Sequence, residues 1–259
     1  QIGFELVTTS NRAVSNLVNM LACVTVEAPI LLISEYCANG DLLHFMRQRR
    51  KYMIENSQAL DESKIMTLKK QIMFSMQIAS GLEYLSRRGF IHRDIAARNI
   101  MVDSEESCKI GDFGLCRIIG KQEGGKLPLK WMPPEAIENY CFSVASDVWS
   151  YGVLLFEIVT LGGTPYPGWP ANKLCNRLKD GERMEKPDNC SPELYEMMTF
   201  CWANNPVDRP NFTALRVRLG VLLEEINPDS YYLKLNEHAD YYLLESTAGQ
   251  TNEKEGQRF

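Results

Sequence analysis

Two polar motifs flank a short predicted β-hairpin in the middle of this chain of 259 residues. The first motif is His-Arg-Asp-Ile-Ala-Ala-Arg-Asn at residues 92–99, and the second is Asp-Phe-Gly at residues 112–114. Residues 100–110 contain two short apolar runs around a polar turn, a pattern that predicts two antiparallel strands. Because a hairpin brings together the residues that flank it, we expect Asn99 to lie close to Asp112.

The side chains at the ends of this hairpin suit phosphoryl transfer. Mg²⁺ prefers hard oxygen ligands, and it commonly takes one or two carboxylates together with the phosphates of a substrate. Asn99 and Asp112 supply an amide oxygen and a carboxylate. Asp94 lies a few residues before Asn99, so a short loop can direct its carboxylate at an acceptor hydroxyl while the amide faces the metal.

Five motifs occur in the order that is typical of one family. They are the two motifs above, Trp-Met-Pro-Pro-Glu at residues 131–135, Ser-Asp-Val-Trp-Ser at 146–150 and Asp-Arg-Pro at 208–210. The chain therefore resembles a eukaryotic protein kinase, and the resemblance covers roughly residues 4–226.

Further residues favour one branch of that family. Ala-Ala-Arg between Asp94 and Asn99, and Lys-Trp-Met at residues 130–132, resemble receptor tyrosine kinases. Glu-Tyr-Cys at 35–37 and Gly-Asp-Leu-Leu at 40–43 are similar to the group of the fibroblast, vascular endothelial and platelet-derived growth factor receptors. The resemblance implies a receptor-type kinase domain that is incomplete at its N-terminal end.

The resemblance also implies a role for each polar residue of the first motif. Asp94 would be the catalytic base that accepts the proton of the substrate hydroxyl, while Asn99 and Asp112 would bind Mg²⁺. Arg98 takes the place of a lysine that serine/threonine kinases carry, which favours tyrosine as the acceptor. The implied reaction, with Mg²⁺ present, transfers the γ-phosphoryl group of ATP to a tyrosine of a protein substrate.

Other motif residues are expected to be structural or regulatory rather than catalytic. Glu135 and Arg209 match a buried ion pair of kinases, in which loss of one partner would leave a buried charge at a cost of about 3 to 5 kcal/mol. Asp147 lies in a segment that is apolar on almost every side, so its carboxylate needs hydrogen-bond partners. The remaining members of this set are His92, Arg93, Phe113 and Gly114.

Residues 35–41 are predicted to form a hinge that meets the adenine of ATP. Glu35 and Cys37 would offer backbone groups to the base, and Ser34 would be the gatekeeper residue at the back of the nucleotide pocket. A side chain as small as that of Ser34 would leave the back of the pocket open. The alternative is that Ser34 is an ordinary strand residue.

Two features that hold phosphates in kinases have no counterpart in the sequence. No Gly-x-Gly occurs anywhere, and residues 1–50 contain no lysine, so the glycine-rich loop and the strand lysine lack candidates. The activation segment at residues 115–131 contains no Ser, Thr or Tyr that could be phosphorylated. The alternative function is therefore a catalytically inactive kinase-like module, a pseudokinase or truncated product, that acts as a binding or scaffold domain.

Apolar patterns predict where the secondary structure lies. Apolar runs within residues 17–36 predict a second hairpin. Apolar residues at steps of three and four predict a long helix over residues 64–88, which Gly89 would end. Residues 147–159 are apolar on almost every side, which predicts a helix buried all round.

The predicted order of elements, short strands first and helices afterwards, indicates an α+β fold with segregated helices. A truncated N-terminal β lobe is expected over residues 1–34, with the end of a helix and two strands. After the hinge, residues 42–226 would form a mostly helical C-terminal lobe of the protein-kinase type with a short insert near 52–63. Residues 227–259 would be a tail that is disordered from about residue 246.

Composition argues against several classes of function. A net charge of -5, with 28 Lys and Arg spread through the chain, gives no basic patch for nucleic acid. The longest apolar run is far short of the roughly 20 residues that cross a bilayer, so membrane attachment would require a segment that is not in this chain. We expect a cytoplasmic domain, on the cytoplasmic side of the plasma membrane if the chain is part of a receptor.

Two tyrosine pairs lie near the C-terminus. Tyr231 and Tyr232 are expected to pack against the last predicted helix. Tyr241 and Tyr242 precede apolar residues, and a phosphotyrosine in that setting is a docking signal for phosphotyrosine-binding domains. The expected partners are therefore protein tyrosine substrates and, at the tail, domains of that kind.

Overall fold

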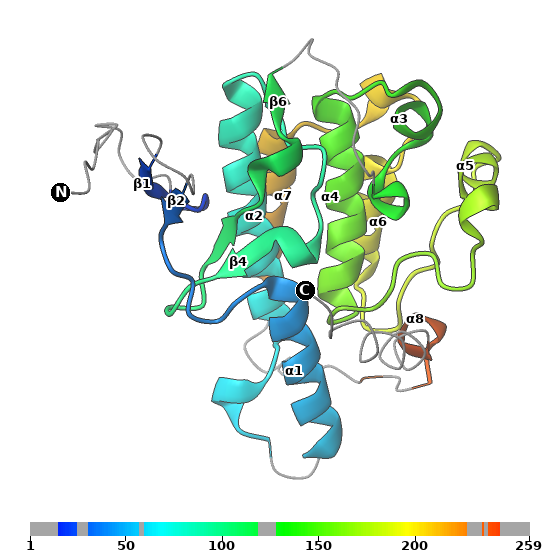
Figure 1. Cartoon of the computed structure of the whole chain (residues 1–259). Coiled ribbons are helices and arrows are strands. Elements are labelled where there is room, and N and C mark those ends of the chain that lie inside the picture. The colour runs from blue at the N-terminus through cyan, green and yellow to red at the C-terminus, as the bar shows by residue number, and fades with distance from the viewer. Residues whose placement is uncertain are drawn as a thin grey trace, which may run out of the picture.

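A computed structural model of the chain places most of the residues that the sequence motifs single out (Figure 1). It describes residues 15–24, 31–56, 60–118, 128–226, 235 and 238–243. Several predicted features lie outside the described residues: the N-terminal end of the β-lobe remnant (1–14), the middle of the activation segment (119–127), the pair Tyr231 and Tyr232, and the tail from residue 244.

The strands come early in the chain and most of the helices follow. The strands are β1 (Met20–Val24), β2 (Leu31–Ser34), β3 (Phe90–Ile91), β4 (Ile100–Val102), β5 (Cys108–Ile110) and β6 (Arg117–Ile118). The helices are α1 (Leu42–Glu55), α2 (Leu68–Arg87), α3 (Pro134–Asn139), α4 (Val144–Val159), α5 (Ala171–Lys179), α6 (Pro192–Cys201), α7 (Phe212–Glu225) and α8 (Asp240–Leu243). This is the predicted α+β fold, with a mostly helical lobe and small sheets.

Each described strand pairs antiparallel with one partner. β1 pairs with β2, so that Met20 lies opposite Ser34, and β4 pairs with β5, so that Ile100 lies opposite Ile110. Both are the hairpins that the apolar runs predict. β3 pairs with β6, which joins the end of α2 to the start of the activation segment.

The hydrophobic core is centred on α4. This helix packs against α2 and α6, and α2 packs against α7 (Figure 1). Residues 146–159 are all buried, which confirms the helix predicted to be buried on all sides. Tyr151 is buried completely, and its hydroxyl donates a hydrogen bond to the Ser75 carbonyl oxygen at 2.8 Å, so this polar group is satisfied inside the core.

The long helix α2 begins four residues later than the periodicity predicts. Thr67 is its N-cap, because the Thr67 hydroxyl accepts a hydrogen bond from the Lys70 backbone N–H at 3.1 Å. Such a cap satisfies one of the amides that the first turn leaves without a partner. Residues 62–64 instead form a short 3₁₀ turn. At the other end, Gly89 has φ of 77°, and this left-handed conformation ends the helix as predicted.

Helix α1 has no counterpart in the sequence-based prediction. The Asp41 carboxylate caps it by accepting a hydrogen bond from the His44 backbone N–H at 2.9 Å. The helix extends to Glu55, so the first part of the insert expected near residues 52–63 is helical. One side of α1 is buried in the core through Leu42, Phe45, Met46 and Met53.

The hairpin of β1 and β2 lies beside the helical lobe rather than within it (Figure 1). Its side chains are largely exposed, and Leu32 is 70% exposed. The chain just before β1 holds the hairpin against β5, because the Val18 backbone N–H donates to the Ile110 carbonyl oxygen at 2.9 Å. Among the described residues, no helix is both long and apolar enough to cross a bilayer.

Candidate active site

The hairpin of β4 and β5 brings the two polar motifs together, as the sequence predicts. The Gly111 backbone N–H donates to the Asn99 carbonyl oxygen at 2.8 Å, which closes the open end of the hairpin. Asp112 follows Gly111 directly. Asn99 and Asp112 therefore leave the same end of the hairpin.

Asn99 is tied to the loop that carries Asp94. Its side-chain amide nitrogen donates to the Asp94 carbonyl oxygen at 2.8 Å, and its backbone N–H donates to the Ala96 carbonyl oxygen at 2.9 Å. Asn99 is buried. The amide nitrogen is engaged with the loop. The side-chain oxygen of Asn99 therefore remains to accept a hydrogen bond or to coordinate a metal ion.

Asp112 is exposed and adopts a backbone conformation that is uncommon for a non-glycine residue. Its φ is 47°, in the left-handed region, and its carboxylate accepts a hydrogen bond from the Gly114 backbone N–H at 3.2 Å. The neighbouring Phe113 is 39% exposed, with its ring centroid 5.6 Å from that of His92. One carboxylate oxygen of Asp112 is thus held by the turn.

His92 is a buried, neutral side chain that links the two motifs. Its Nε2 lies 3.0 Å from the Gly111 carbonyl oxygen, and because a carbonyl only accepts, Nε2 must carry the proton. Burial lowers the pKa of His92, and the Gly111 carbonyl and the nearby Asp94 and Asp112 offset only part of that shift. His92 therefore fixes the position of the loop relative to Gly111.

Asp147, at the start of α4, holds the backbone of the first motif. Its two carboxylate oxygens accept hydrogen bonds from the backbone N–H groups of His92 at 2.7 Å and Arg93 at 2.9 Å. These are the partners that a buried carboxylate requires. Burial raises the pKa of Asp147 to about 7, although the two N–H donors act in the opposite direction.

The two arginines of the first motif both lie over aromatic rings. The Arg98 guanidinium forms an ion pair with Asp94 and lies 4.4 Å from the centroid of the Trp131 ring. The Arg93 guanidinium lies 4.0 Å from the centroid of the Phe142 ring. Such cation–π contacts help to fix the guanidinium groups. Arg98 is therefore beside the predicted base, while Arg93 faces the segment that follows α3.

Glu157 belongs to the site, and the sequence analysis does not identify it. Its Oε2 accepts hydrogen bonds from the Ala97 backbone N–H at 3.0 Å and from the Trp131 indole nitrogen at 2.9 Å. Burial raises the pKa of Glu157 to about 7. The signal in the sequence is a single carboxylate inside the apolar run 152–159, since a charge there needs partners.

Glu135 and Arg209 form a bidentate ion pair behind the site. The two nitrogen–oxygen distances are 2.6 and 3.1 Å. The Arg209 side chain has no exposed surface, and its guanidinium also donates to the carbonyl oxygens of Ala203 and Ala145 at 2.9 and 3.0 Å. The pair joins the start of α3 to the turn that precedes α7.

The residues of the predicted hinge lie at the end of β2. The Glu35 backbone N–H donates to the Asn19 carbonyl oxygen, and the Glu35 carboxylate accepts from the Lys109 ammonium at 2.6 Å. Burial raises the pKa of Glu35, but the bonds from Lys109 and Asn19 outweigh it and lower the pKa overall. Cys37 is buried, whereas Ser34 is exposed on the hairpin.

The residues present fit Mg²⁺ only as part of a complex with phosphate. No group of three or more His, Cys, Asp or Glu in the described part of the chain is arranged to hold a metal ion. Asn99 and Asp112 offer two oxygens at one end of the hairpin, whereas Mg²⁺ takes about six ligands. Phosphate oxygens and water would have to complete the shell.

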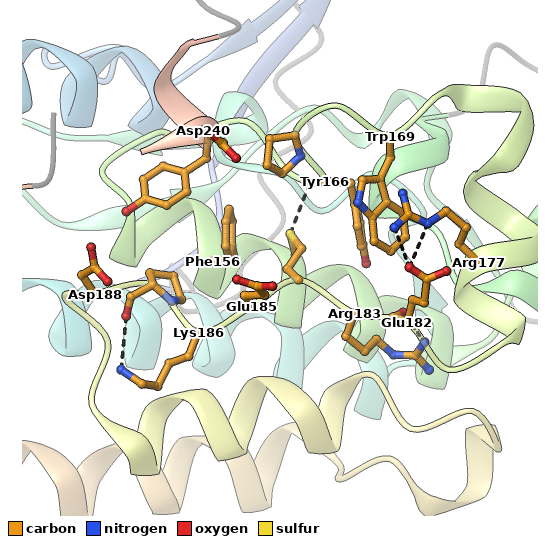
Figure 2. A pocket seen from close by; sticks show the side chains of 14 residues that line it. Phe156, Tyr166, Trp169, Arg177, Glu182, Arg183, Glu185, Lys186, Asp188 and Asp240 are labelled. Atoms are coloured by element: carbon orange, nitrogen blue, oxygen red, sulfur yellow. Dashed lines mark hydrogen bonds and ion pairs between the residues drawn. The ribbon is translucent and has the colours of Figure 1, made fainter. Parts of the chain in front are cut away.

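Two described cavities lie away from this site. One, of about 390 Å³, lies between Phe156, Tyr166, Trp169 and the segment 182–188 (Figure 2). The other, of about 500 Å³, lies beside the hinge and α1, and includes His44 and Tyr52. Neither of these two cavities is lined by Asp94, Asn99 or Asp112.

The helical lobe, the closed hairpin and the buried carboxylate of Asp147 together define a kinase-type C-terminal lobe. The chain belongs to the protein tyrosine and serine/threonine kinase family, whose sequence profile matches residues 4–219. The predicted family is therefore confirmed.

The most similar relatives include receptor tyrosine kinases. The chain is 39% identical over 243 residues to tyrosine kinase receptor Cad96Ca of Drosophila melanogaster, a match that covers 91% of this chain and 31% of that protein. It is 41% identical over 236 residues to fibroblast growth factor receptor 1 of Xenopus laevis, covering 88% of this chain and 29% of the receptor. The chain thus spans less than a third of the length of these relatives.

Proposed function

We propose that the chain carries the catalytic half of a receptor-type tyrosine kinase, which transfers the γ-phosphoryl group of ATP to tyrosine of a protein substrate. The observation that carries the proposal is the bond between the Asn99 side chain and the Asp94 carbonyl, together with the bond that closes the hairpin beside Asp112. These contacts support the proposal because they tie the residue that would be the base, Asp94, to Asn99, and tie Asn99 to the residue before Asp112.

Each residue of the candidate site would have its own role in the reaction. Asp94 would accept the proton of the tyrosine hydroxyl, and Arg98 would orient the Asp94 carboxylate through their ion pair. Asn99 and Asp112 would hold Mg²⁺. When bound with ATP, this ion would neutralise charge on the transferred phosphoryl group. Glu157 would keep Ala97 and Trp131 in place, and through Trp131 it would limit the movement of Arg98.

The similarity to receptor tyrosine kinases supports a cellular setting for the proposed reaction. As part of a receptor, the domain would act on the cytoplasmic side of the plasma membrane on protein tyrosine substrates. Phosphorylated tail tyrosines would provide docking sites for phosphotyrosine-binding domains.

A second candidate function is a catalytically inactive binding module. The sequence offers no Gly-x-Gly and no lysine in residues 1–50 to hold phosphates. Lys109, on the hairpin beside the site, cannot take over that role while its ammonium binds Glu35 at 2.6 Å and Asp103 at 3.7 Å. This observation favours an inactive module for the polypeptide acting by itself.

A fusion protein would distinguish between the two candidate functions. We suggest joining a kinase N-terminal segment that contains a Gly-x-Gly-x-x-Gly loop and a strand lysine to the first residue of this chain. With a competent catalytic half, the fusion should phosphorylate a tyrosine peptide but not the same peptide with serine. Asp94→Asn should lower the rate by about 100-fold or more, because a general base is removed.

The control is Asp180→Asn, which changes an exposed carboxylate at the end of α5 and should leave the rate unchanged. A folded fusion that transfers no phosphate, or that transfers it equally well with Asp94→Asn, would contradict the proposed function and support the binding module.

A further inference from the structure

The tail segment 240–243 is seated on the helical lobe. It forms the short helix α8, and the Tyr241 carbonyl oxygen accepts a hydrogen bond from the Thr164 backbone N–H at 2.9 Å. The Tyr241 ring packs edge-on against Phe156 of α4, with the ring centroids 5.7 Å apart. This geometry is favourable for aromatic pairs. Both the backbone and the side chain of Tyr241 therefore contact the lobe.

The loop after α4 is shaped to allow this close approach. A Cβ atom at Gly163 would lie 2.9 Å from Cδ2 of the Tyr241 ring and 2.7 Å from the Thr160 hydroxyl oxygen. Both distances are too short for any side chain larger than hydrogen. Glycine at position 163 therefore lets the Tyr241 ring lie directly over the backbone of the loop.

Tyr242 adds a second anchor on α1. The guanidinium of Arg50 lies 4.1 Å from the centroid of the Tyr242 ring, and the same guanidinium donates to the Leu161 carbonyl oxygen at 3.2 Å. The two tyrosine rings also contact each other, with centroids 4.5 Å apart. The pair is thus held by α1, by α4 and by the loop that follows α4.

The surroundings of Tyr241 disfavour added negative charge. Tyr241 and Asp240 line one part of the cavity of about 390 Å³, and Figure 2 shows Asp240 and Asp188 on the side away from Arg177 and Glu182. Burial raises the pKa of Tyr241; Asp188 raises it further, and Arg50 acts in the opposite direction. The charged form of this side chain is therefore disfavoured where it lies.

The cations of the same cavity are already engaged. Arg177 binds the Glu182 carboxylate at 2.9 Å. Arg183 donates to the carbonyl oxygens of Leu178 and Trp202, and the Lys186 ammonium donates to the Cys190 carbonyl oxygen at 3.0 Å. A new anion at Tyr241 would have to compete with these bonds for a partner.

We propose that Tyr241 is a phosphorylation site that controls the docking of segment 240–243 on the lobe. In the modification, the Tyr241 hydroxyl oxygen bonds to the γ-phosphorus of ATP, and the bond from that phosphorus to the β–γ bridging oxygen breaks. ADP leaves, and the phenolic proton passes to a base of the modifying tyrosine kinase. The phosphate carries a charge of about −1.5 to −2 at neutral pH. In this half-buried position it is disfavoured by the Asp188 carboxylate, and the nearby Arg50 guanidinium is already engaged with the Leu161 carbonyl oxygen. The modified segment therefore leaves the lobe, and the phosphotyrosine becomes accessible to a recognition domain.

Hydrogen exchange tests this proposal on the full chain. The protein is treated with ATP, Mg²⁺ and a purified tyrosine kinase, and mass spectrometry measures phosphate at Tyr241 and the exchange of the Thr164 amide. Phosphorylation should speed that exchange by about tenfold or more, because the bond to the Tyr241 carbonyl is lost. The Tyr241→Phe variant keeps the ring, and the same treatment should leave its Thr164 exchange unchanged.

A second variant tests the docking of segment 240–243 without any kinase. Untreated Tyr241→Ala removes the ring from Phe156, and its Thr164 amide should exchange as fast as in the phosphorylated chain. Protection of Thr164 that persists after complete phosphorylation of Tyr241 would overturn the release. Equal exchange in untreated wild type and Tyr241→Ala would overturn the docking itself.

Discussion

Asp147 holds Arg93 in a left-handed backbone conformation. The Arg93 backbone nitrogen lies 2.9 Å from the Asp147 carboxylate, and the φ of Arg93 is 72°. A non-glycine residue in this region costs about 1 to 3 kcal/mol and persists only where its surroundings enforce it. The carboxylate at the start of α4 therefore sets the path of the loop that carries Asp94.

Asp147→Asn should destabilise the fold by about 2 to 3 kcal/mol. The amide oxygen can still accept one backbone N–H, but the amide nitrogen cannot accept, so the other N–H loses its partner. A protonated carboxyl group differs in this respect, since both of its oxygens still carry lone pairs. Urea unfolding would measure the loss. Asp180→Asn, at an exposed position, should change stability by no more than about 0.5 kcal/mol. Equal stabilities for Asp147→Asn and wild type would show that the carboxylate does not hold Arg93.

The raised pKa of Glu157 predicts a pH dependence of stability. The carboxyl group has a pKa of about 7 in the folded chain, against 4.5 ordinarily, so the folded state binds the proton more tightly than the unfolded chain. Its contribution is then fully present below pH 4.5 and is lost as the pH rises to about 7. Other groups titrate in the same range, so the difference between wild type and Glu157→Gln isolates this carboxyl group. We expect the stability of wild type relative to Glu157→Gln to fall between pH 5 and 7 by up to about 1.4 kcal/mol per pH unit. A difference that is flat or rises in this range would contradict the assignment.

The buried ion pair of Glu135 and Arg209 should contribute more to the stability of the fold than an exposed ion pair does. Glu135→Ala leaves the fully buried Arg209 guanidinium without its carboxylate, which should cost about 3 kcal/mol, near the lower end of the range for buried pairs. The carbonyl oxygens of Ala203 and Ala145 would still offset part of the loss. The matched control is Glu138→Ala, which breaks an exposed pair with Lys179 and should cost less than about 1 kcal/mol. Chemical denaturation would compare the two, and similar losses for both variants would argue against the buried pair.

Mg²⁺ with ATP should give no measurable rise in the melting temperature of this chain by itself. Asn99 and Asp112 offer only two oxygens to the metal, and the sequence provides no glycine-rich loop for the phosphates. A ligand raises the stability of a fold appreciably only when its concentration is comparable to or above its dissociation constant. A thermal shift titration would test this. A clear rise that disappears in Asp112→Asn would show that the site binds nucleotide without those parts.

Local patterns in the sequence were enough to predict the elements that shape the site. The apolar runs around residues 103–107 predict the hairpin, and the periods of the apolar residues predict α2 and α4, because side-chain direction repeats every two residues in a strand and every 3.6 in a helix. The apolar stripe does not locate the start of α2, because the Thr67 cap sets that boundary. Helix α1 lies outside the sequence-based prediction although it carries local signals, namely the Asp41 cap and the spacing of Leu42, Phe45 and Met46, which are three and four residues apart.

The sequence by itself determined the family, the order of the elements and the residue types at the hairpin ends, since these depend on neighbouring residues and on motif spacing. The tertiary structure alone decided which distant groups meet. Glu157 reaches Ala97 and Trp131, and Tyr241 reaches Phe156. Such contacts form only when separate helices pack together, and no local pattern encodes the partner of a buried carboxylate or of a tail ring.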